Sequence, residues 1–139
     1  MVMRGAIVFA VAVLFGGSVT AQSRSVWDGV YTAEQAKRGE SMYLQECARC
    51  HGQRLFGGET GPELTGDTFL EGWYGETVGL LFEITQTTMP FEAPDSLSGS
   101  QYADVVAHML SVNGFPAGEQ QLASDAEPLK QIVIERKKE

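Results

Sequence analysis

Two cysteines and one histidine lie close together in the stretch Cys47-Ala48-Arg49-Cys50-His51, and the chain has no other cysteine. The pattern C-x-x-C-H is the attachment signature of a c-type haem. On a helical turn, residues three apart share one face, so both thiols can form thioether bonds to the vinyl groups of one porphyrin. The imidazole that follows can bind the iron as its proximal ligand. The motif occurs once, so the sequence predicts one covalently attached haem c on Cys47, Cys50 and His51.

Two other chemistries use cysteines at this spacing. A thioredoxin-like redox pair belongs in a βαβ unit, and no strand is predicted before the motif. A structural zinc site needs four ligands, but outside the motif the chain has no cysteine and only one histidine, His108. His108 is expected on the polar side of a helix, four residues after Asp104, as a solvated side chain. Haem attachment is therefore the favoured interpretation.

Met89 is the candidate for the sixth iron ligand. It precedes Pro90, which must end the preceding helix and biases Met89 towards an extended backbone. A thioether on a stiff loop is well placed to reach the iron, and methionine with histidine is a ligand pair of cytochromes c. Met42 and Met109 are the rivals, but both are predicted inside helices as packing residues.

The N-terminal residues predict export. Met1–Arg4 is basic, Ala6–Phe15 is an apolar run, and Val19-Thr20-Ala21 offers small residues for cleavage. The apolar run is short for a transmembrane helix. Residues 1–21 are therefore predicted to be a signal peptide, with the protein in the periplasm and without stable membrane insertion. An uncleaved anchor remains the alternative.

Length and charge restrict the partners. The 139 residues favour one domain. The formal net charge is −8. Loss of residues 1–21 removes one positive charge, that of Arg4, and no acidic residue, and so leaves −9. Such a charge argues against nucleic acid and anionic membranes, and it suits a protein partner with a basic patch.

The elements that position these residues are expected to be helices. Capping boxes at Thr32-x-x-Gln35 and Ser98-x-x-Gln101 predict a first helix to about residue 47 and a last long helix to about residue 112. Gly39 lies on the packing stripe of the first helix and predicts a close crossing by another helix. Between the long helices we expect a glycine-rich loop that can approach a flat ligand, a helix over Thr68–Trp73 capped by Asp67, and a helix over Glu76–Gln86.

The two ends of the mature chain carry weaker signals. Residues 22–31 are expected to be extended, with Trp27 packing on the body. Beyond Pro116 the chain is polar until Leu129–Ile134, a β-branched run expected to pack as a strand or arm. The last residues, Glu135–Glu139, are expected to be a solvated charged end.

In order, these features resemble class I cytochrome c. The matching parts are the helix leading into the C-x-x-C-H motif, Gly61-Pro62-Glu63-Leu64, Met89-Pro90 and the terminal helix, so the resemblance covers about residues 32–115. It implies an all-α chain, with a small cytochrome c fold of three to five helices wrapped around one covalently attached haem. It also implies that the Pro62 carbonyl accepts a hydrogen bond from His51, which would fix the histidine tautomer.

The resemblance further implies that the first and last helices cross at Gly39 and Tyr43, opposite Tyr102 and Val106. The implied organisation is a signal peptide (1–21), an N-terminal extended lead-in (22–31), a cytochrome c domain (32–116) and a C-terminal extension (117–139).

The implied function is electron transfer in the periplasm rather than enzymatic catalysis. The stretches Val26-Trp27-Asp28-Gly29-Val30-Tyr31-Thr32 and Asn113-Gly114-Phe115-Pro116-Ala117-Gly118 look like those of cytochromes found with quinoprotein dehydrogenases. That narrower resemblance implies a quinoprotein dehydrogenase as donor and an oxidase or another cytochrome as acceptor. Two alternatives stay open: a haem-based ligand-binding or peroxidase-like protein with an open sixth position, and a subunit permanently docked to a dehydrogenase.

Replacing both Cys47 and Cys50 by serine is expected to abolish covalent haem attachment, because a hydroxyl does not form the thioether. Haem staining of a denaturing gel of the exported protein measures the effect against the unsubstituted chain. Staining that survives the double substitution would contradict the assignment.

Overall fold

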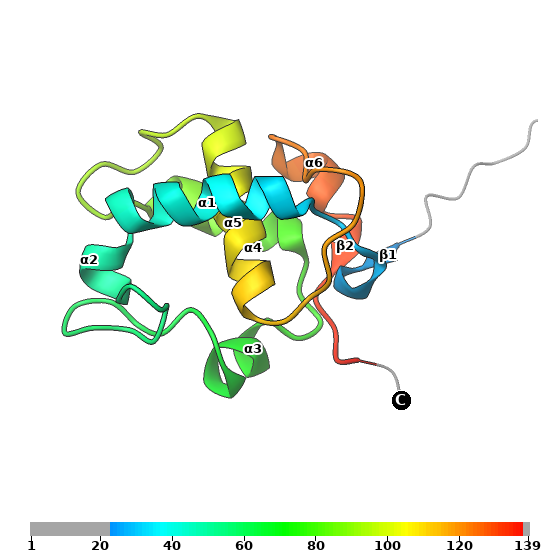
Figure 1. The fold of residues 1–139 in the computed structure, drawn as a ribbon, viewed down its shortest axis with the longest axis horizontal. Helices are drawn as coiled ribbons and strands as arrows, with labels where there is room; N and C mark the ends of the chain where they lie inside the picture. The colour runs from blue at the N-terminus through cyan, green and yellow to red at the C-terminus, as the bar shows by residue number, and fades with distance from the viewer. Residues whose placement is uncertain (1–22, 138–139) are drawn as a thin grey trace, which may run out of the picture.

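The computed structural model describes residues 23–137, and the predicted signal peptide lies outside this range. Over these residues the predicted all-α class is confirmed, with six α-helices, two of them of four residues, and very little strand (Figure 1). No helix in residues 23–137 combines the length and apolar character that crossing a bilayer requires. The elements in order are β1 (Arg24–Ser25), the 3-10 helix η1 (Val26–Asp28), α1 (Ala33–Glu46), α2 (Ala48–His51), α3 (Asp67–Trp73), α4 (Val78–Thr88), α5 (Gly99–Val112), α6 (Ala126–Leu129) and β2 (Ile132–Val133).

The caps of the two long helices differ in one respect from the prediction. At α5, both halves of the capping box between Ser98 and Gln101 are present. At α1, the Thr32 hydroxyl accepts the N–H of Gln35 at 3.1 Å. The other half of the predicted capping box, from the Gln35 side chain back to the Thr32 backbone, is wrong. The Gln35 amide instead donates to the Leu122 carbonyl at 3.2 Å and accepts the Leu122 N–H at 2.8 Å. Because Gln35 is buried, pairing both its polar groups with the returning tail avoids an unsatisfied polar group.

The two middle helices differ from the prediction at their first residues: α3 begins one residue earlier and α4 two residues later. Asp67 is the first residue of α3, and the preceding Gly66 occupies the cap position, so the predicted Asp67 cap is wrong. Helix α4 is displaced by two residues from the predicted Glu76–Gln86, because the Thr77 hydroxyl caps it by accepting the N–H of Leu80 at 3.1 Å. It continues to Thr88, and Met89 then has the extended backbone that Pro90 predicts.

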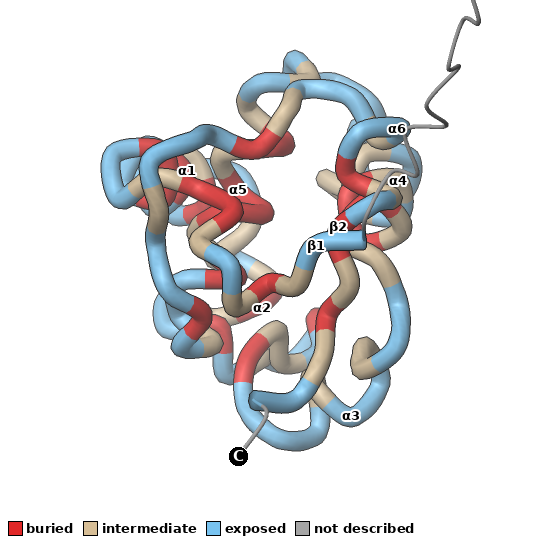
Figure 2. The backbone as a smooth tube through the Cα atoms, turned by 90° about the vertical axis from the view of Figure 1, so that its right-hand side faces the viewer, coloured by how far each residue is buried: buried red, intermediate tan, exposed pale blue. Residues whose placement is uncertain are grey.

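The packing centre is the crossing of α1 and α5, where buried segments of both helices face each other (Figures 1 and 2). A Cβ atom placed on Gly39 would lie 1.8 Å from the Asp104 carbonyl oxygen, so only glycine allows this approach. The predicted close crossing at Gly39 is therefore confirmed. The atoms nearest to it belong to Asp104 and His108, whereas the implied partners Tyr102 and Val106 are buried two positions to either side of Asp104 on α5.

The prediction that His108 is a solvated side chain beside Asp104 is wrong. His108 is half-buried at the helix crossing, with its ring centroid 5.4 Å from that of Tyr43. Burial lowers the pKa of His108, and the negative charge of Glu40 opposes this shift. Asp104 pairs with Arg38 of α1 at 2.9 Å. Residues 104 and 108 thus form the α5 face that meets α1.

The lead-in and the tail are fastened to each other and to the core. β1 and β2 pair in parallel, with Arg24 opposite Ile132. The Trp27 indole packs edge-on against Phe115, at 4.9 Å between ring centroids, and donates to the Glu135 carbonyl at 2.8 Å. The predicted run at Leu129–Ile134 does contribute a strand, Ile132–Val133. At the end that was predicted to be solvated, Glu135 is half-buried and accepts this bond, whereas residues 136 and 137 are exposed.

Gly39→Ala is expected to lower the free energy of unfolding by about 3 kcal/mol, because α1 and α5 would have to move apart or repack. Urea unfolding of the holoprotein measures the change. Gly72→Ala in α3 is the matched control, since among the described residues no atom lies within 4 Å of the added Cβ. The control should be neutral or stabilising by roughly 0.5–1 kcal/mol. Equal effects of the two substitutions would contradict the close crossing.

Candidate haem-binding site

The C-x-x-C-H motif forms its own helical turn at the end of α1. Cys47 ends α1 by donating its N–H to the Tyr43 carbonyl at 2.9 Å. The Cys47 carbonyl then accepts the N–H groups of Cys50 at 3.1 Å and His51 at 3.0 Å, which starts α2. Both cysteines are free and half-buried. The two thiols and the imidazole therefore project from one short turn.

The environment of Cys47 distinguishes between the chemistries considered for the motif. Burial raises the pKa of the Cys47 thiol to about 11, and the charges of Glu46 and Cys50 contribute in the same direction. A redox-active C-x-x-C pair needs a lowered thiol pKa. Within residues 23–137, no three His, Cys, Asp or Glu side chains gather in a group that could hold a metal ion.

His51 is held in one tautomer. The residue is 7% exposed, and its Nδ1 lies 2.8 Å from the Pro62 carbonyl oxygen. A carbonyl oxygen only accepts, so Nδ1 carries the hydrogen and Nε2 keeps its lone pair. This is the contact that the class I resemblance implies. It leaves Nε2 as the nitrogen that can bind iron and strengthens the imidazole as a donor.

The glycine-rich loop packs on the backbone of the motif. A Cβ on Gly58 would lie 2.6 Å from the Cys50 carbonyl oxygen, and one on Gly61 would lie 2.7 Å from it. The Gly57 N–H donates to the His51 carbonyl at 2.9 Å. The glycines are thus needed for close contact with the backbone of residues 50 and 51. The sequence had instead suggested that they allow the loop to approach a flat ligand. This contact carries Pro62 to the histidine ring.

Met89 lies at the end of α4 and is half-buried. Its N–H donates to the Thr85 carbonyl at 3.0 Å, and its carbonyl accepts the Tyr102 hydroxyl at 2.7 Å. Arg49, inside the motif, forms an ion pair with Glu92 at 2.9 Å. The structure therefore connects the loop of Met89 directly to the C-x-x-C-H turn.

The rival methionines behave as packing residues. Met109 is buried inside α5, and Met42 packs partly buried on the core from α1.

Three contacts of the site had no signal in the sequence, because each joins residues that are not neighbours along the chain. They are the Tyr102 hydroxyl bond to Met89, the Arg49–Glu92 ion pair and the packing of Gly61 on Cys50.

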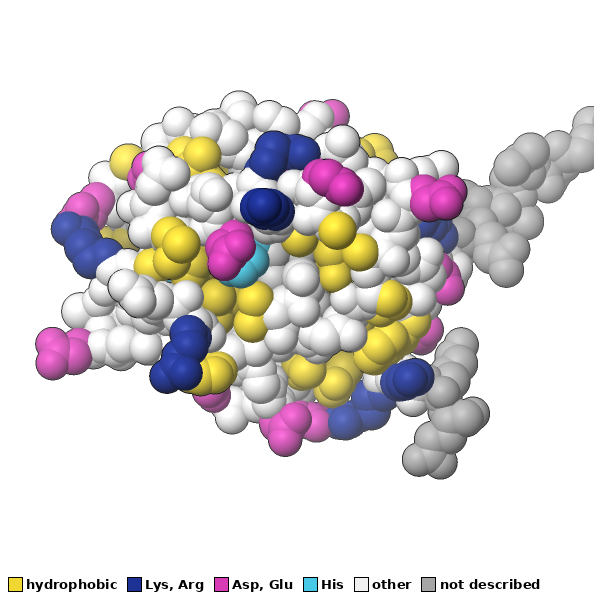
Figure 3. Space-filling view, in the orientation of Figure 1, with side chains coloured by type: hydrophobic (Ala, Val, Ile, Leu, Met, Phe, Trp, Pro, Cys, Tyr) yellow, Lys and Arg dark blue, Asp and Glu magenta, His cyan; other side chains and the backbone are white. Residues whose placement is uncertain are grey.

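The arrangement fits a haem c. The donor set offers two thiols, an imidazole nitrogen and a thioether from two connected segments. Several apolar side chains on or beside these segments are not covered by protein, including Phe91, which is 81% exposed, Ile84 of α4 and Phe56 of the glycine-rich loop. An apolar ring bound there would cover part of such surface. Figure 3 shows apolar side chains exposed among charged ones on one face of the molecule.

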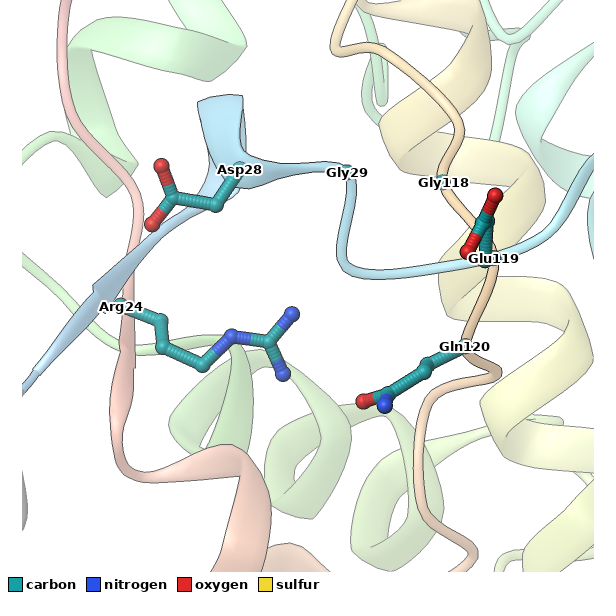
Figure 4. Close-up of a pocket in the computed structure, with 6 residues that line it drawn as sticks. All are labelled: Arg24, Asp28, Gly29, Gly118, Glu119 and Gln120. Atoms are coloured by element: carbon teal, nitrogen blue, oxygen red, sulfur yellow. The ribbon is translucent and has the colours of Figure 1, made fainter.

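A separate hollow of about 590 Å³ lies where the lead-in meets the tail (Figure 4). It contains none of the predicted site residues, and Figure 1 places β1 at the opposite end of the molecule from α2. Its lining residues are Arg24, Asp28, Gly29, Gly118, Glu119 and Gln120.

Comparisons with known proteins show the family and the fold of this chain. Residues 34–109, more than half of the chain, match the family described as cytochrome c oxidase, cbb3-type, subunit III. Among solved structures, the chain is similar to the sulfane dehydrogenase SoxCD from Paracoccus pantotrophus, with a TM-score of 0.56 and 23% sequence identity. The similarity covers 78% of this chain and 61% of that one, so this chain spans less than two thirds of it. No curated protein matches the chain.

Pro62→Ala is expected to keep the haem but loosen the bond to His51, because alanine frees the loop that directs the carbonyl. A less strongly donating imidazole favours ferrous iron, so the reduction potential should rise, on the order of tens of millivolts. Redox titration measures it, with Pro116→Ala on an exposed loop as control. An unchanged potential would remove Pro62 from this role.

Proposed function

The chain belongs to the family of cytochrome c oxidase, cbb3-type, subunit III, whose members are c-type cytochromes, and from this we propose that it is a periplasmic one-electron carrier with a single haem c. The observation that carries the proposal is the hydrogen bond at 2.8 Å between His51 Nδ1 and the Pro62 carbonyl. It prepares the imidazole, at the end of the two-cysteine turn, to bind iron through Nε2. We assign Cys47 and Cys50 to covalent attachment, and His51 and Met89 to the iron.

Each of these residues has one task in the proposed mechanism. The haem, when bound, supplies an iron that alternates between the ferric and ferrous states. Cys47 and Cys50 hold the porphyrin through thioethers. His51 and Met89 would be the two protein ligands of the iron in both states, which would leave no free position on the iron for a substrate. A thioether ligand and an apolar surrounding both favour ferrous iron and raise the reduction potential.

The partner assignment rests on sequence patterns, charge and relatives. We propose a dehydrogenase of the quinoprotein class as electron donor and an oxidase or another cytochrome as acceptor. The net charge of −9 after loss of residues 1–21 suits basic docking surfaces on both. The names of the similar proteins, an oxidase subunit family and a dehydrogenase complex, support this choice. Export by the signal peptide at 1–21 and a cytochrome domain over 32–116 belong to the same proposal.

Met89→Ala is expected to leave the haem attached and to open the sixth position. The reduction potential should fall, because water stabilises ferrous iron less than a thioether does. The ferrous form should then bind carbon monoxide, and the weak near-infrared sulfur-to-iron band of the ferric form should disappear. Absorption spectra and redox titration measure all three changes.

Met109→Ala and Met42→Ala are the controls for Met89. Both should keep the band, and Met109→Ala, at a buried site, should cost about 2–5 kcal/mol of stability. If Met89→Ala kept the band while a control lost it, the ligand assignment would be wrong. A wild-type ferric spectrum without the band and with high-spin features would instead favour the ligand-binding or peroxidase-like alternative.

A further inference from the structure

Both backbone polar groups of Met89 are held by specific partners. Its N–H donates to Thr85 at 3.0 Å, as the last bond of α4, and its carbonyl accepts the Tyr102 hydroxyl at 2.7 Å. Pro90 follows and has a fixed φ. The peptide planes on both sides of the Met89 Cα are therefore fixed, and they set the direction of its Cα–Cβ bond.

Tyr102 is itself rigidly placed. It is 1% exposed on α5, and its ring packs edge-on against Phe82 of α4, with 6.3 Å between ring centroids. The same hydroxyl lies 3.5 Å from the N–H of Leu97, at the far end of the loop that begins at Met89. One buried hydroxyl thus connects the start and the end of this loop to the core helix.

Two other side-chain contacts that hold the loop are exposed. The side chains of Arg49 and Glu92 are each 75% exposed in their ion pair, and the bond at 2.9 Å between Gln86 and Asp95 is also on the surface. Exposed pairs contribute little because water screens them. A buried hydrogen bond to a carbonyl is worth more, since its loss leaves an acceptor without a partner.

We propose that Tyr102 is a positioning residue for the sixth iron ligand, and that its hydroxyl, by holding the Met89 carbonyl, keeps the thioether on the iron. This inference rests on the proposed function, in which Met89 binds iron. Tyr102 does not touch the iron and acts only through the backbone of Met89. Without its hydroxyl, the ring would stay packed on Phe82 while the Met89 peptide gained freedom.

The test compares Tyr102→Phe with the wild-type ferric holoprotein during an alkaline titration. Hydroxide competes for the iron as the pH rises, so the midpoint at which the sulfur-to-iron band disappears reports how firmly the thioether is held. Loss of one hydrogen bond should weaken ligation by roughly two- to tenfold. For release coupled to one proton, the midpoint should fall by up to about one pH unit. Carbon monoxide should also bind the ferrous variant faster.

Tyr31→Phe is the matched control. Tyr31 is 2% exposed and donates its hydroxyl to the Phe115 carbonyl at 2.5 Å. The substitution therefore removes a tyrosine-to-carbonyl hydrogen bond of the same kind, but one that does not involve Met89. Tyr31→Phe should lower the free energy of unfolding by an amount comparable to Tyr102→Phe but keep the wild-type midpoint. Glu92→Gln, which breaks the exposed ion pair, should shift the midpoint less than Tyr102→Phe.

The outcomes separate this inference from the proposed function. A lower midpoint in Tyr102→Phe, with no fall in Tyr31→Phe and a smaller fall in Glu92→Gln, supports it. An unchanged midpoint, an equal fall in Tyr31→Phe, or a larger fall in Glu92→Gln overturns it while the wild-type band keeps Met89 on the iron. Absence of the band in the wild type overturns both the inference and the assignment of Met89.

Discussion

The contact between Gly39 and the backbone of α5 is the constraint on which the rest of the structure depends. With 1.8 Å between a hypothetical Cβ and the Asp104 carbonyl oxygen, no larger residue allows the same crossing. Helix α1 continues directly into the C-x-x-C-H turn, and α5 carries Tyr102, which bonds to Met89. The crossing therefore sets the relative position of the two segments that supply the proposed iron ligands.

Hydrogen bonds to backbone carbonyls complete this positioning. His51 donates to Pro62, and Tyr102 donates to Met89. Tyr43, at the helix crossing, donates to the carbonyl of Gly52 at 2.7 Å, directly after the histidine. Each bond starts from a buried or nearly buried ring and ends on an irregular segment. Loops without regular secondary structure are fixed in this way by the rigid helices beneath them.

The residues after Pro116 add buried apolar side chains to a hydrophobic core that would otherwise be small for a chain of this size. Buried side chains after Pro116 include Leu122, Leu129, Ile132 and Ile134. Gln35 holds Leu122 through two hydrogen bonds, and β2 pairs with β1. A small domain buries a modest fraction of its surface, so such additions matter for stability. The lead-in and the tail thus stabilise the end of the fold remote from the C-x-x-C-H turn.

The sequence by itself determined the features that depend on neighbouring residues: the C-x-x-C-H turn, the Ser98 capping box and the extended backbone of Met89 before Pro90. Their physics is local, because spacing, caps and proline act within a few residues. Only the tertiary structure decided the partner of Gln35, the half-buried place of His108 and the packing of Gly61 on Cys50. In each case a polar or small residue meets a segment distant in the sequence, and no local pattern specifies which segment that is.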